Sequence, residues 1–449
     1  MNPITAPVQK SARQVHRNNA RSASVAHQSV AIIGLGYVGL PLALATEQGG
    51  YRVIGFDIDE AKNAALERRR APFLSEEEQR TFRTSAMAIT NDPRQLAEAE
   101  IVIICVPTPV NDDHTPDLRP LEAASTTVGS ALRHGALVIV ESTVSPGACE
   151  SVALRAIEAA SGLTGGKDFS FAHCPERINP GDTAFSVLNI PRVVGGLDDE
   201  SLARATDFYL GIVDAEIIPM ASLKEAEAVK MVENSFRDIN IAFVNELAMS
   251  FEKAGIDIVN VIRGASSKPF AFMPHFPGCG VGGHCIPVDP YYLIHYGKEN
   301  GFQHRFLETA RAINNNMPAH TVDRLESALS EHGIALAGST VALLGLTYKR
   351  DISDMRESPA EVIRLELEER GATVQSFDPY VARESTASSV DQALRGAVGV
   401  IIATDHREFK ALTPEHFIRA GVGVVIDGRN CLSKELFANS GVTYRGIGR

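Results

Sequence analysis

The residue with the clearest chemical potential in this sequence is Cys285, which lies in a segment rich in glycine and proline. Residues 277–290 read Pro-Gly-Cys-Gly-Val-Gly-Gly-His-Cys-Ile-Pro-Val-Asp-Pro. Glycines carry no side chain, so other backbone or a ligand can approach this segment closely. Asp289 adds a carboxylate four residues after the thiol. A free cysteine is often an inert core residue, and Cys105, inside an apolar run, fits that description. The surroundings of Cys285 instead favour a nucleophile, which reacts as the thiolate.

Two polar residues on a predicted long helix have a spacing that suits catalysis. Residues 222–254 contain neither glycine nor proline. Lys230 and Asn234 are four residues apart, so they share one helix face and could donate hydrogen bonds to a developing oxyanion. A solvated surface pair is the alternative explanation of this spacing. Apolar residues at steps of three and four predict a buried stripe on the same helix, formed by Val229, Val232, Phe236, Ile239, Phe243 and Leu247.

A glycine-rich segment near the start predicts a dinucleotide-binding turn. The apolar strand 30–33 is followed directly by Gly34-x-Gly36-x-x-Gly39 and then by a helical stretch. Such glycines permit a tight turn and the close approach of a pyrophosphate to the helix N-terminus. Asp57, at the end of the next strand, suits a ribose hydroxyl and would repel the 2′-phosphate of NADP. The pattern therefore predicts NAD as the cofactor, with a tight turn that binds no ligand as the alternative.

Apolar strands that alternate with helical segments predict an α/β fold. Two Rossmann-like doubly wound domains are expected on either side of an all-helical domain. The predicted boundaries are a disordered basic tail at 1–29, an NAD-binding domain at 30–215, a central helical domain at 216–320 and a C-terminal α/β domain at 321–449.

Composition excludes several other classes of protein. The net charge of −12 argues against binding to nucleic acid. The six cysteines lack the spacing of a disulfide framework, and neighbouring His-Cys pairs do not match zinc-ligand spacing, so no metal is predicted. A reducing cytoplasm suits a thiolate enzyme. The basic first 29 residues have no apolar core of a signal peptide, and glycines and Pro41 interrupt the apolar run 30–45, so no membrane span is expected.

Beyond these separate motifs, residues 29–449 resemble the UDP-glucose/GDP-mannose 6-dehydrogenase family of nucleotide-sugar dehydrogenases. The matching segments, in chain order, are 30–41, 105–109, 141–144, 175–177, 230–234, the Cys285 segment, 348–351, 355–358 and 427–429. The resemblance implies oxidation of a sugar C6 alcohol to a carboxylate, with two NAD⁺ and one water. It also implies a thiohemiacetal and then a thioester on Cys285, which would hold the aldehyde between the two oxidations.

The resemblance assigns roles to individual residues. Lys230 and Asn234 would stabilise the oxyanion and position water, Asp289 would hold that water or tune Lys230, and the other catalytic residues would be Cys285, Glu176 and Thr143. The cofactor would contact Gly34, Gly36, Tyr37, Val38, Gly39, Asp57, Thr108, Thr143 and Arg356. The UDP-sugar would contact Glu176, Arg177, Lys230, Asn234, Phe276, Gly282, Tyr348, Lys349 and Arg429. Family members also form homodimers or higher homo-oligomers through the central helices, and Arg429 matches an arginine that reaches the substrate across subunits.

Two segments bear on which sugar is oxidised. Residues 267–278 and 309–314 resemble the subgroup that acts on UDP-N-acetylglucosamine, which makes precursors of surface polysaccharides. The alternatives are 6-dehydrogenases of UDP-N-acetylmannosamine or UDP-glucose. A different class would be a catalytically dead protein that binds NAD or a nucleotide sugar. The chain departs from the family at Cys279, where proline is usual, and at Cys174, where a small residue is common. Each is either an inert replacement or an oxidative partner of Cys285.

Overall fold

A computed structural model describes residues 28–111, 113–178 and 185–449 of the 449-residue chain. The basic tail expected at 1–29 lies outside the described residues, apart from its last two positions. Contacts divide the chain into two compact units, and each is described by itself. Unit 1 contains the residues up to Pro109 and Pro116–Lys230, and unit 2 contains Val110–Thr115 and Met231–Arg449.

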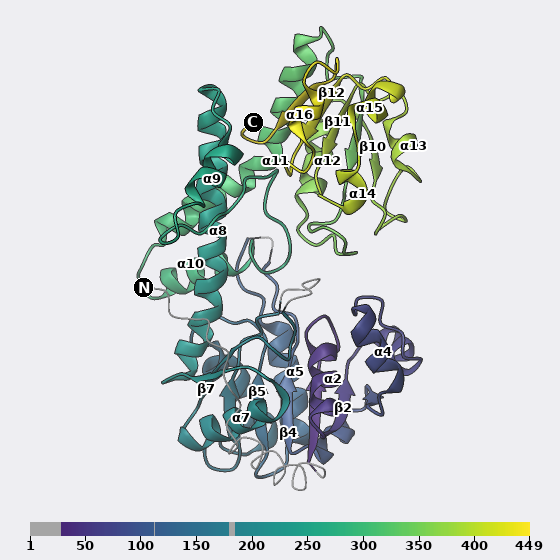
Figure 1. The fold of residues 1–449 in the computed structure, drawn as a ribbon. Coiled ribbons are helices and arrows are strands. Elements are labelled where there is room, and N and C mark those ends of the chain that lie inside the picture. The colour runs from purple at the N-terminus through teal and green to yellow at the C-terminus, as the bar shows by residue number, and fades with distance from the viewer. Residues whose placement is uncertain (1–27, 112, 179–184) are drawn as a thin grey trace. The chain divides into compact units, whose positions relative to one another are not determined.

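Unit 1 is built on an eight-stranded sheet with the order β3-β2-β1-β4-β5-β6-β7-β8 (Figure 1). Neighbouring strands are parallel except β6 and β7. The winding reverses between β1 and β4, which is the point where doubly wound sheets bind dinucleotides. The strands are β1 (Ser29–Ile33), β2 (Arg52–Phe56), β3 (Ala88–Thr90), β4 (Ile101–Ile104), β5 (Leu137–Val140), β6 (Ser170–His173), β7 (Arg192–Gly196) and β8 (Ile217–Pro219).

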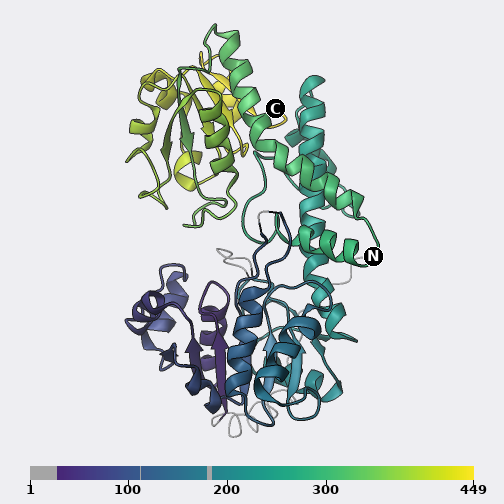
Figure 2. The ribbon, with the colours of Figure 1, turned by 180° about the vertical axis from the view of Figure 1, so that it is seen from behind.

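Helices cover both faces of this sheet, as the opposite views show (Figures 1 and 2). Alternate residues of β1 point to opposite faces. Val30 and Ile32 therefore pack with α2 (Gly39–Gln48) and α7 (Asp199–Ile212). Ala31 and Ile33 pack with α5 (Arg119–Ala131) and α6 (Arg155–Ser161). Burial on both faces explains why these strands are continuous apolar runs. The remaining elements are α3 (Glu60–Glu67), α4 (Glu76–Thr84), η1 (Pro93–Glu98) and η2 (Cys149–Leu154).

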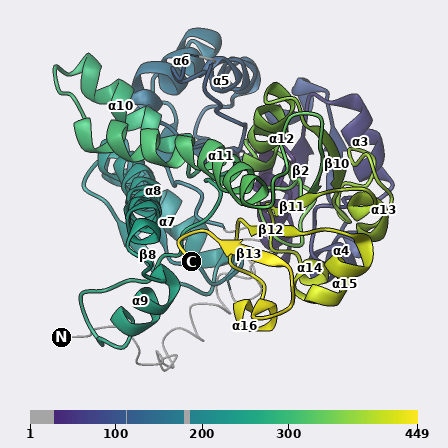
Figure 3. The same ribbon diagram turned by 90° about the horizontal axis from the view of Figure 1, so that it is seen from above.

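Unit 2 combines a group of helices with a second, wholly parallel sheet of order β10-β9-β11-β12-β13. The long helix α11 (Arg305–Glu331) packs on α12 (Pro359–Glu369) and on this sheet (Figure 3). The strands are β9 (Thr340–Leu344), β10 (Thr373–Phe377), β11 (Gly399–Ile402), β12 (Val424–Asp427) and β13 (Thr443–Gly446). The helices are α9 (Ile258–Ala265), α10 (Asp289–Glu299), α11 (Arg305–Glu331), α12 (Pro359–Glu369), α13 (Val390–Leu394), α14 (Arg407–Lys410), α15 (Pro414–Ala420) and α16 (Lys434–Phe437).

The long helix predicted over 222–254 is confirmed as α8 (Leu223–Lys253), but its predicted buried stripe is wrong. Val232, Phe236 and Phe243 are 59%, 48% and 53% exposed. Apart from Leu223, Met231 and Val244, the buried residues of α8 are small or polar, namely Ala226, Glu227, Lys230, Ser235, Asp238, Ala242, Asn245 and Ala248. Apolar periodicity shows which face of a helix is hydrophobic. It does not show whether that face packs in the core of the same chain or is exposed as a surface for a partner.

The mainly parallel sheet of unit 1, the wholly parallel sheet of unit 2 and the helices packed on each confirm the predicted α/β class. In the described part of the chain, the helices lack the combination of length and apolar character that crossing a bilayer requires.

Candidate active site

Cys285 is a partly exposed cysteine just before α10. Its carbonyl oxygen accepts hydrogen bonds from the backbone N–H groups of Val288 (3.1 Å) and Asp289 (2.8 Å). This turn fixes the thiol just before the helix N-terminus, where the partial positive charge of the helix favours an anion. The position therefore suits a thiolate nucleophile.

The glycines before Cys285 allow close packing against the loop between β9 and α12. A Cβ atom on Gly282 would lie 2.7 Å from both the carbonyl oxygen of Glu357 and the Cβ of Tyr348. A Cβ atom on Gly283 would lie 2.7 Å from the ring of Tyr348. The backbone N–H of Gly283 donates to the carbonyl oxygen of Arg356 at 3.1 Å. The expected close approach is thus made by another segment of this chain, the one that carries the predicted ligand-binding residues Tyr348, Lys349 and Arg356.

This packing predicts a strong effect for Gly283→Ala. Gly283 has φ of +90°, a conformation that L residues rarely adopt, and a methyl group would also overlap the Tyr348 ring. We expect a loss of stability of about 1–3 kcal/mol and a weaker affinity for the nucleotide, measured by thermal unfolding and by calorimetry with UDP.

Gly264→Ala in α9 is the matched control. That glycine has an ordinary backbone conformation and an added methyl would meet open space, so stability should stay equal or rise. Equal behaviour of the two variants would contradict the packing explanation.

Asn234 and Asp289 are in direct contact. The side-chain amide of Asn234 donates to Oδ2 of Asp289 at 2.5 Å, and Asp289 is buried. Since Asp289 is also the first residue of α10, this contact joins α8 to the turn that holds Cys285. Unit 2 therefore brings together three of the predicted catalytic residues.

Lys230 lies one turn before Asn234 on α8 and pairs with Glu176. Its Nζ is 3.5 Å from Oε2 of Glu176, and both side chains are buried. Burial raises the pKa of Glu176, and it prevails over the lowering effect of the Lys230 cation. Oε1 of Glu176 has no hydrogen-bond partner among the described residues, so a carboxyl group of altered acidity has an oxygen free to act on a ligand or water.

A buried polar cluster lies behind Glu176, and the sequence did not predict it. Arg192 donates from Nη1 to Oε1 of Glu141 at 2.9 Å, and the hydroxyl of Tyr209 donates to the same oxygen at 2.5 Å. Nη1 of Arg192 also lies 3.8 Å from the sulfur of Cys174. Glu141 raises the pKa of Glu176 and Arg192 lowers it. The charges of this cluster therefore influence the pKa of Glu176.

The pH profile of the enzyme tests this influence. Glu141→Gln removes a negative charge that raises the pKa of Glu176, so the carboxylate should persist to lower pH. If ionised Glu176 is needed for turnover, the acid limb of kcat/KM for the UDP-sugar should move to lower pH. Tyr209→Phe, which leaves the charges unchanged, should leave that limb in place. A limb that does not move in Glu141→Gln would show that another group controls it.

The glycine turn of unit 1 fits a dinucleotide. Gly34 has φ of +93°, and a Cβ on Gly39 would collide with the carbonyl oxygen of Gly34. Both glycines are therefore required by the turn itself. A Cβ on Gly36 would meet open space, so the protein's own packing does not require glycine there, whereas the close approach of a pyrophosphate would.

Asp57, Thr108 and Thr143, which are predicted to bind the cofactor, belong to unit 1 like this turn. Oδ2 of Asp57 accepts the backbone N–H of Leu35 at 2.9 Å and pairs with Nζ of Lys62 at 2.8 Å. The hydroxyl of Thr108 donates to the carbonyl oxygen of Thr143 at 2.7 Å. Ile58 is 84% exposed beside Asp57, and sequence reasoning missed it. An apolar residue directly after the acid that is predicted to bind ribose was the available signal.

Tyr37, Val38 and Arg177 also belong to unit 1. The ring of Tyr37 lies 4.9 Å from that of Phe73, and Val38 is the N-cap residue of α2. The guanidinium of Arg177 donates to the carbonyl oxygen of Pro191 at 2.7 Å.

The remaining predicted residues belong to unit 2. Arg356 binds both carboxylate oxygens of Asp354 through Nε. Arg429 donates to the carbonyl oxygens of Ala403 and Gly280, and so supports the glycine segment. Phe276 is exposed.

The two cysteines that depart from the family pattern are fully buried. Burial raises the pKa of Cys174 to about 12 and also raises that of Cys279. Burial and a disfavoured thiolate are typical of inert thiols. In the described residues, no group of three or more His, Cys, Asp or Glu side chains is arranged to hold a metal ion.

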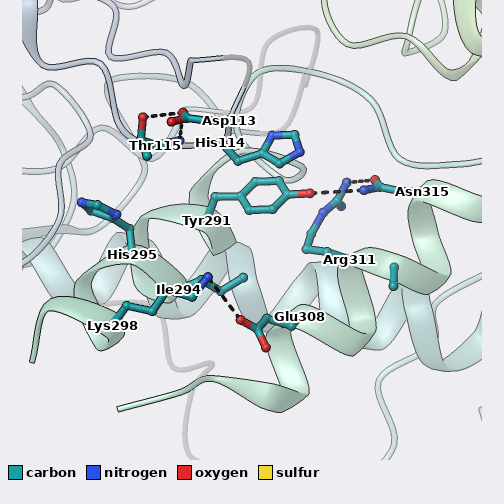
Figure 4. A pocket seen from close by; sticks show the side chains of 11 residues that line it. Asp113, His114, Thr115, Tyr291, Ile294, His295, Lys298, Glu308, Arg311 and Asn315 are labelled. Atoms are coloured by element: carbon teal, nitrogen blue, oxygen red, sulfur yellow. Dashed lines mark hydrogen bonds and ion pairs between the residues drawn. The ribbon is translucent and has the colours of Figure 1, made fainter. Parts of the chain in front are cut away.

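A separate cavity of about 420 Å³ lies between α10, α11 and residues 113–115, and none of the predicted site residues lines it (Figure 4). The rings of His114 and Tyr291 stack there with centroids 4.1 Å apart. Arg311, which also lines it, is neutralised by Asp238 at 2.6 Å.

Comparison with known proteins agrees with this geometry. Three models of the UDP-glucose/GDP-mannose dehydrogenase family match in order: the NAD binding domain at 28–213, the central domain at 224–316 and the UDP binding domain at 342–434. The chain belongs to this family. It is therefore an NAD-dependent nucleotide-sugar 6-dehydrogenase, and the glycine turn of unit 1 lies in its NAD-binding domain.

Its relatives act on different sugars. The chain is 39% identical to a UDP-N-acetyl-D-glucosamine 6-dehydrogenase of Pseudomonas aeruginosa, over 87% of this chain and 94% of that protein. It is 37% identical to a UDP-N-acetyl-D-mannosamine dehydrogenase of Pyrococcus horikoshii, over 94% of this chain and 99% of that protein. A solved UDP-D-ManNAc dehydrogenase structure from P. horikoshii matches with a TM-score of 0.89 and 36% identity, over 94% of this chain and 99% of that one.

Proposed function

We propose that this dehydrogenase oxidises UDP-N-acetylglucosamine at C6 to the uronate through a covalent adduct on Cys285. In balance, the CH₂OH group, two NAD⁺ and one water give the carboxylate, two NADH and three protons. When bound, NAD⁺ accepts one hydride in each of the two oxidations. The observation that carries the proposal is the partly exposed thiol at the start of α10, with Asn234 and Asp289 joined beside it.

The protein's own residues have distinct tasks in this scheme. The sulfur of Cys285 adds to the C6 aldehyde, and the resulting hydroxyl stays on carbon as a thiohemiacetal. After the second oxidation gives the thioester, water adds to its carbonyl, the C–S bond breaks and the thiolate is restored. Lys230 and the amide of Asn234 donate hydrogen bonds to the oxyanion, while Glu176 and Asp289 bind the water and take up its proton, and Thr143 assists proton transfer.

Substrate and cofactor contacts follow the same assignment. Gly34–Gly39, Asp57, Thr108, Thr143 and Arg356 hold NAD, and we add the exposed Ile58 as a surface for the adenine. The UDP-sugar is held by the remaining predicted set, which comprises Glu176, Arg177, Lys230, Asn234, Phe276, Gly282, Tyr348, Lys349 and Arg429.

The choice of sugar rests on segments 267–278 and 309–314, whose sequences resemble the N-acetylglucosamine subgroup. The similarity to the P. aeruginosa enzyme supports it, and so does 38% identity to a UDP-N-acetyl-D-glucosamine 6-dehydrogenase of Salmonella typhi. UDP-N-acetylmannosamine is the second candidate, because of the similarity to the P. horikoshii protein. The two substrates differ at one stereocentre.

We also propose a homodimer in the cytoplasm, with domains at 30–215, 216–320 and 321–449 and a tail at 1–29. The exposed apolar residues of α8 continue into segment 270–276, since the rings of Phe236 and His275 are in contact and Phe270, Met273 and Phe276 are exposed. One continuous apolar surface of this kind suits a second copy of the chain. A monomeric mass in light scattering would contradict it.

The test is NADH formation with UDP-N-acetylglucosamine, UDP-N-acetylmannosamine and UDP-glucose, together with the mass of the product. We expect two NADH per uronate and the highest kcat/KM with UDP-N-acetylglucosamine. A higher kcat/KM with either other sugar would reassign the substrate. One NADH per product, or no activity with any of the three, would overturn the proposed reaction.

A further inference from the structure

We propose that His406 is a positioning residue that holds the nucleotide-binding loop Thr347–Asp351 in its binding conformation. The inference rests on the proposed contacts of Tyr348 and Lys349 with the UDP group. His406 itself lies outside the predicted site and is completely buried, just before α14.

Both ring nitrogens of His406 have defined partners. The backbone N–H of Asp351 donates to Nδ1 at 2.9 Å. Because Nδ1 accepts, the ring proton is on Nε2, and Nε2 lies 2.9 Å from Oδ2 of Asp378. The hydroxyl of Thr347 lies 3.2 Å from the same Nε2. One histidine therefore contacts both ends of the loop.

Aromatic neighbours fix the orientation of the ring. Tyr380 stacks on His406 with centroids 4.8 Å apart, and Phe409 contacts it edge-on at 5.3 Å. The hydroxyl of Tyr380 also donates to Oδ1 of Asp351 at 3.1 Å. The imidazole cannot turn without losing these contacts, so the end of the loop at Asp351 is fixed through it.

Comparison of the two α/β units explains why this position is occupied by a histidine. In unit 1, Gly34 has φ of +93° and Leu35 donates its N–H to Asp57. In unit 2, Gly345 has φ of +92° and Leu346 donates its N–H to Asp378 at 2.7 Å. The turn and the acid at the end of the second strand therefore recur in both sheets.

The two acids differ in what else they bind. Asp378 is wholly buried, and its Oδ2 also accepts the N–H of Thr347 (3.0 Å) and faces Nε2 of His406. Its other oxygen, Oδ1, accepts the backbone N–H of Tyr380 at 2.8 Å, and the residue has no exposed surface at which a ribose hydroxyl could bind. It serves instead as the anchor of His406, so that a position suited to ribose binding has become a support for the loop.

The supported loop also reaches the catalytic segment. Tyr348 packs against Gly282 and Gly283, three and two residues before Cys285. If Thr347 and Asp351 lost their contacts with His406, the loop would therefore lose its packing against the segment that carries Cys285. It would also lose its proposed contacts with the diphosphate. If the loop has its binding conformation only part of the time, the measured affinity equals the affinity of the ordered loop multiplied by the fraction of molecules in which it is ordered.

Three substitutions separate the two hydrogen bonds. His406→Asn places an amide oxygen near the position of Nδ1 and keeps an acceptor for Asp351. His406→Gln places an amide nitrogen near Nε2 and keeps only the donor to Asp378. His406→Phe keeps a ring and removes both. His416→Phe is the control: this histidine lies in the same unit and caps α15 through Thr413, and phenylalanine removes that cap as it removes both bonds of His406.

The measurement is the Kd of the full-length protein for UDP by calorimetry, with thermal unfolding of each variant alongside. We expect His406→Phe to raise Kd about tenfold or more, His406→Gln to raise it nearly as much, and His406→Asn to raise it least. His416→Phe should lower the unfolding temperature and leave Kd unchanged.

Other outcomes are distinguishable. A wild-type Kd in His406→Phe, or equal rises in Kd for the Asn and Gln variants, would overturn the role of His406 while leaving the proposed function intact. A rise in Kd for His416→Phe that matches its loss of stability would show a general structural effect instead. Failure of the wild-type protein to bind UDP would overturn the proposed function together with this inference.

Discussion

Cys285→Ser is expected to lower the rate of NADH formation by roughly a thousandfold or more, because a neutral hydroxyl is a far weaker nucleophile than a thiolate. The side chains differ by one atom, and the thiol is partly exposed, so packing should change little. The Kd for UDP should therefore remain within about twofold of the wild-type value, since no contact with the nucleotide is lost. Turnover is followed by absorbance and binding by calorimetry.

Cys279→Ser is the matched control, because this second thiol lies in the same segment. Its sulfur is buried and lies 3.4 Å from the carbonyl oxygen of Ala403, to which a serine hydroxyl can also donate. The variant should keep most of the activity. Mass spectrometry of wild-type enzyme, quenched during turnover, should show the sugar adduct on the peptide that contains Cys285. Full activity in Cys285→Ser would exclude covalent catalysis by this residue.

Lys230→Met should have the second-largest effect, lowering kcat by roughly a hundredfold to a thousandfold, the range known for the loss of an oxyanion donor. Methionine fills a similar volume but cannot donate a hydrogen bond. It also removes the cation that lowers the pKa of Glu176. The pKa of Glu176 should therefore rise further. Its carboxyl group would then stay protonated and neutral up to a higher pH, so that no unpaired charge is buried in the site.

Lys224→Met on the same helix is the control. Lys224 is exposed and makes only a distant ion pair with Glu150 at 3.9 Å, so stability should change by no more than about 0.5 kcal/mol. Its kcat should equal that of the wild type. If Lys230→Met kept a wild-type kcat while Glu176 remained in place, Lys230 would have a structural role only.

Short stretches of sequence were sufficient to predict many of the structural elements of this protein. The first glycine turn and Asp57 could be found because a dinucleotide site needs a strand, a turn without side chains and an acid within a short stretch of chain. The helix over 222–254 followed from its composition, and the two α/β sheets followed from apolar strands that alternate with helices. Those expectations concern neighbours in sequence, where spacing fixes geometry.

The errors and omissions concern contacts between distant residues. The stripe of α8 was assigned to the core because it is apolar, yet the helix buries Glu227, whose carboxylate accepts the backbone N–H of Cys149 at 2.8 Å. A buried acid satisfied by backbone groups of another segment leaves no periodic signal. The cluster around Arg192 and the anchor formed by His406 were missed for the same reason.

The sequence by itself determined the chemistry available to this protein: a thiol beside a helix start, a lysine and an asparagine one turn apart, and a turn for NAD. Only the tertiary structure decided which partners these groups have. It joined Asn234 to Asp289 and Lys230 to Glu176, and it showed that the glycines before Cys285 make room for the Tyr348 loop. The physical reason is that side-chain identity and local backbone preference are encoded residue by residue, whereas burial and charge pairing arise only when separate segments pack together.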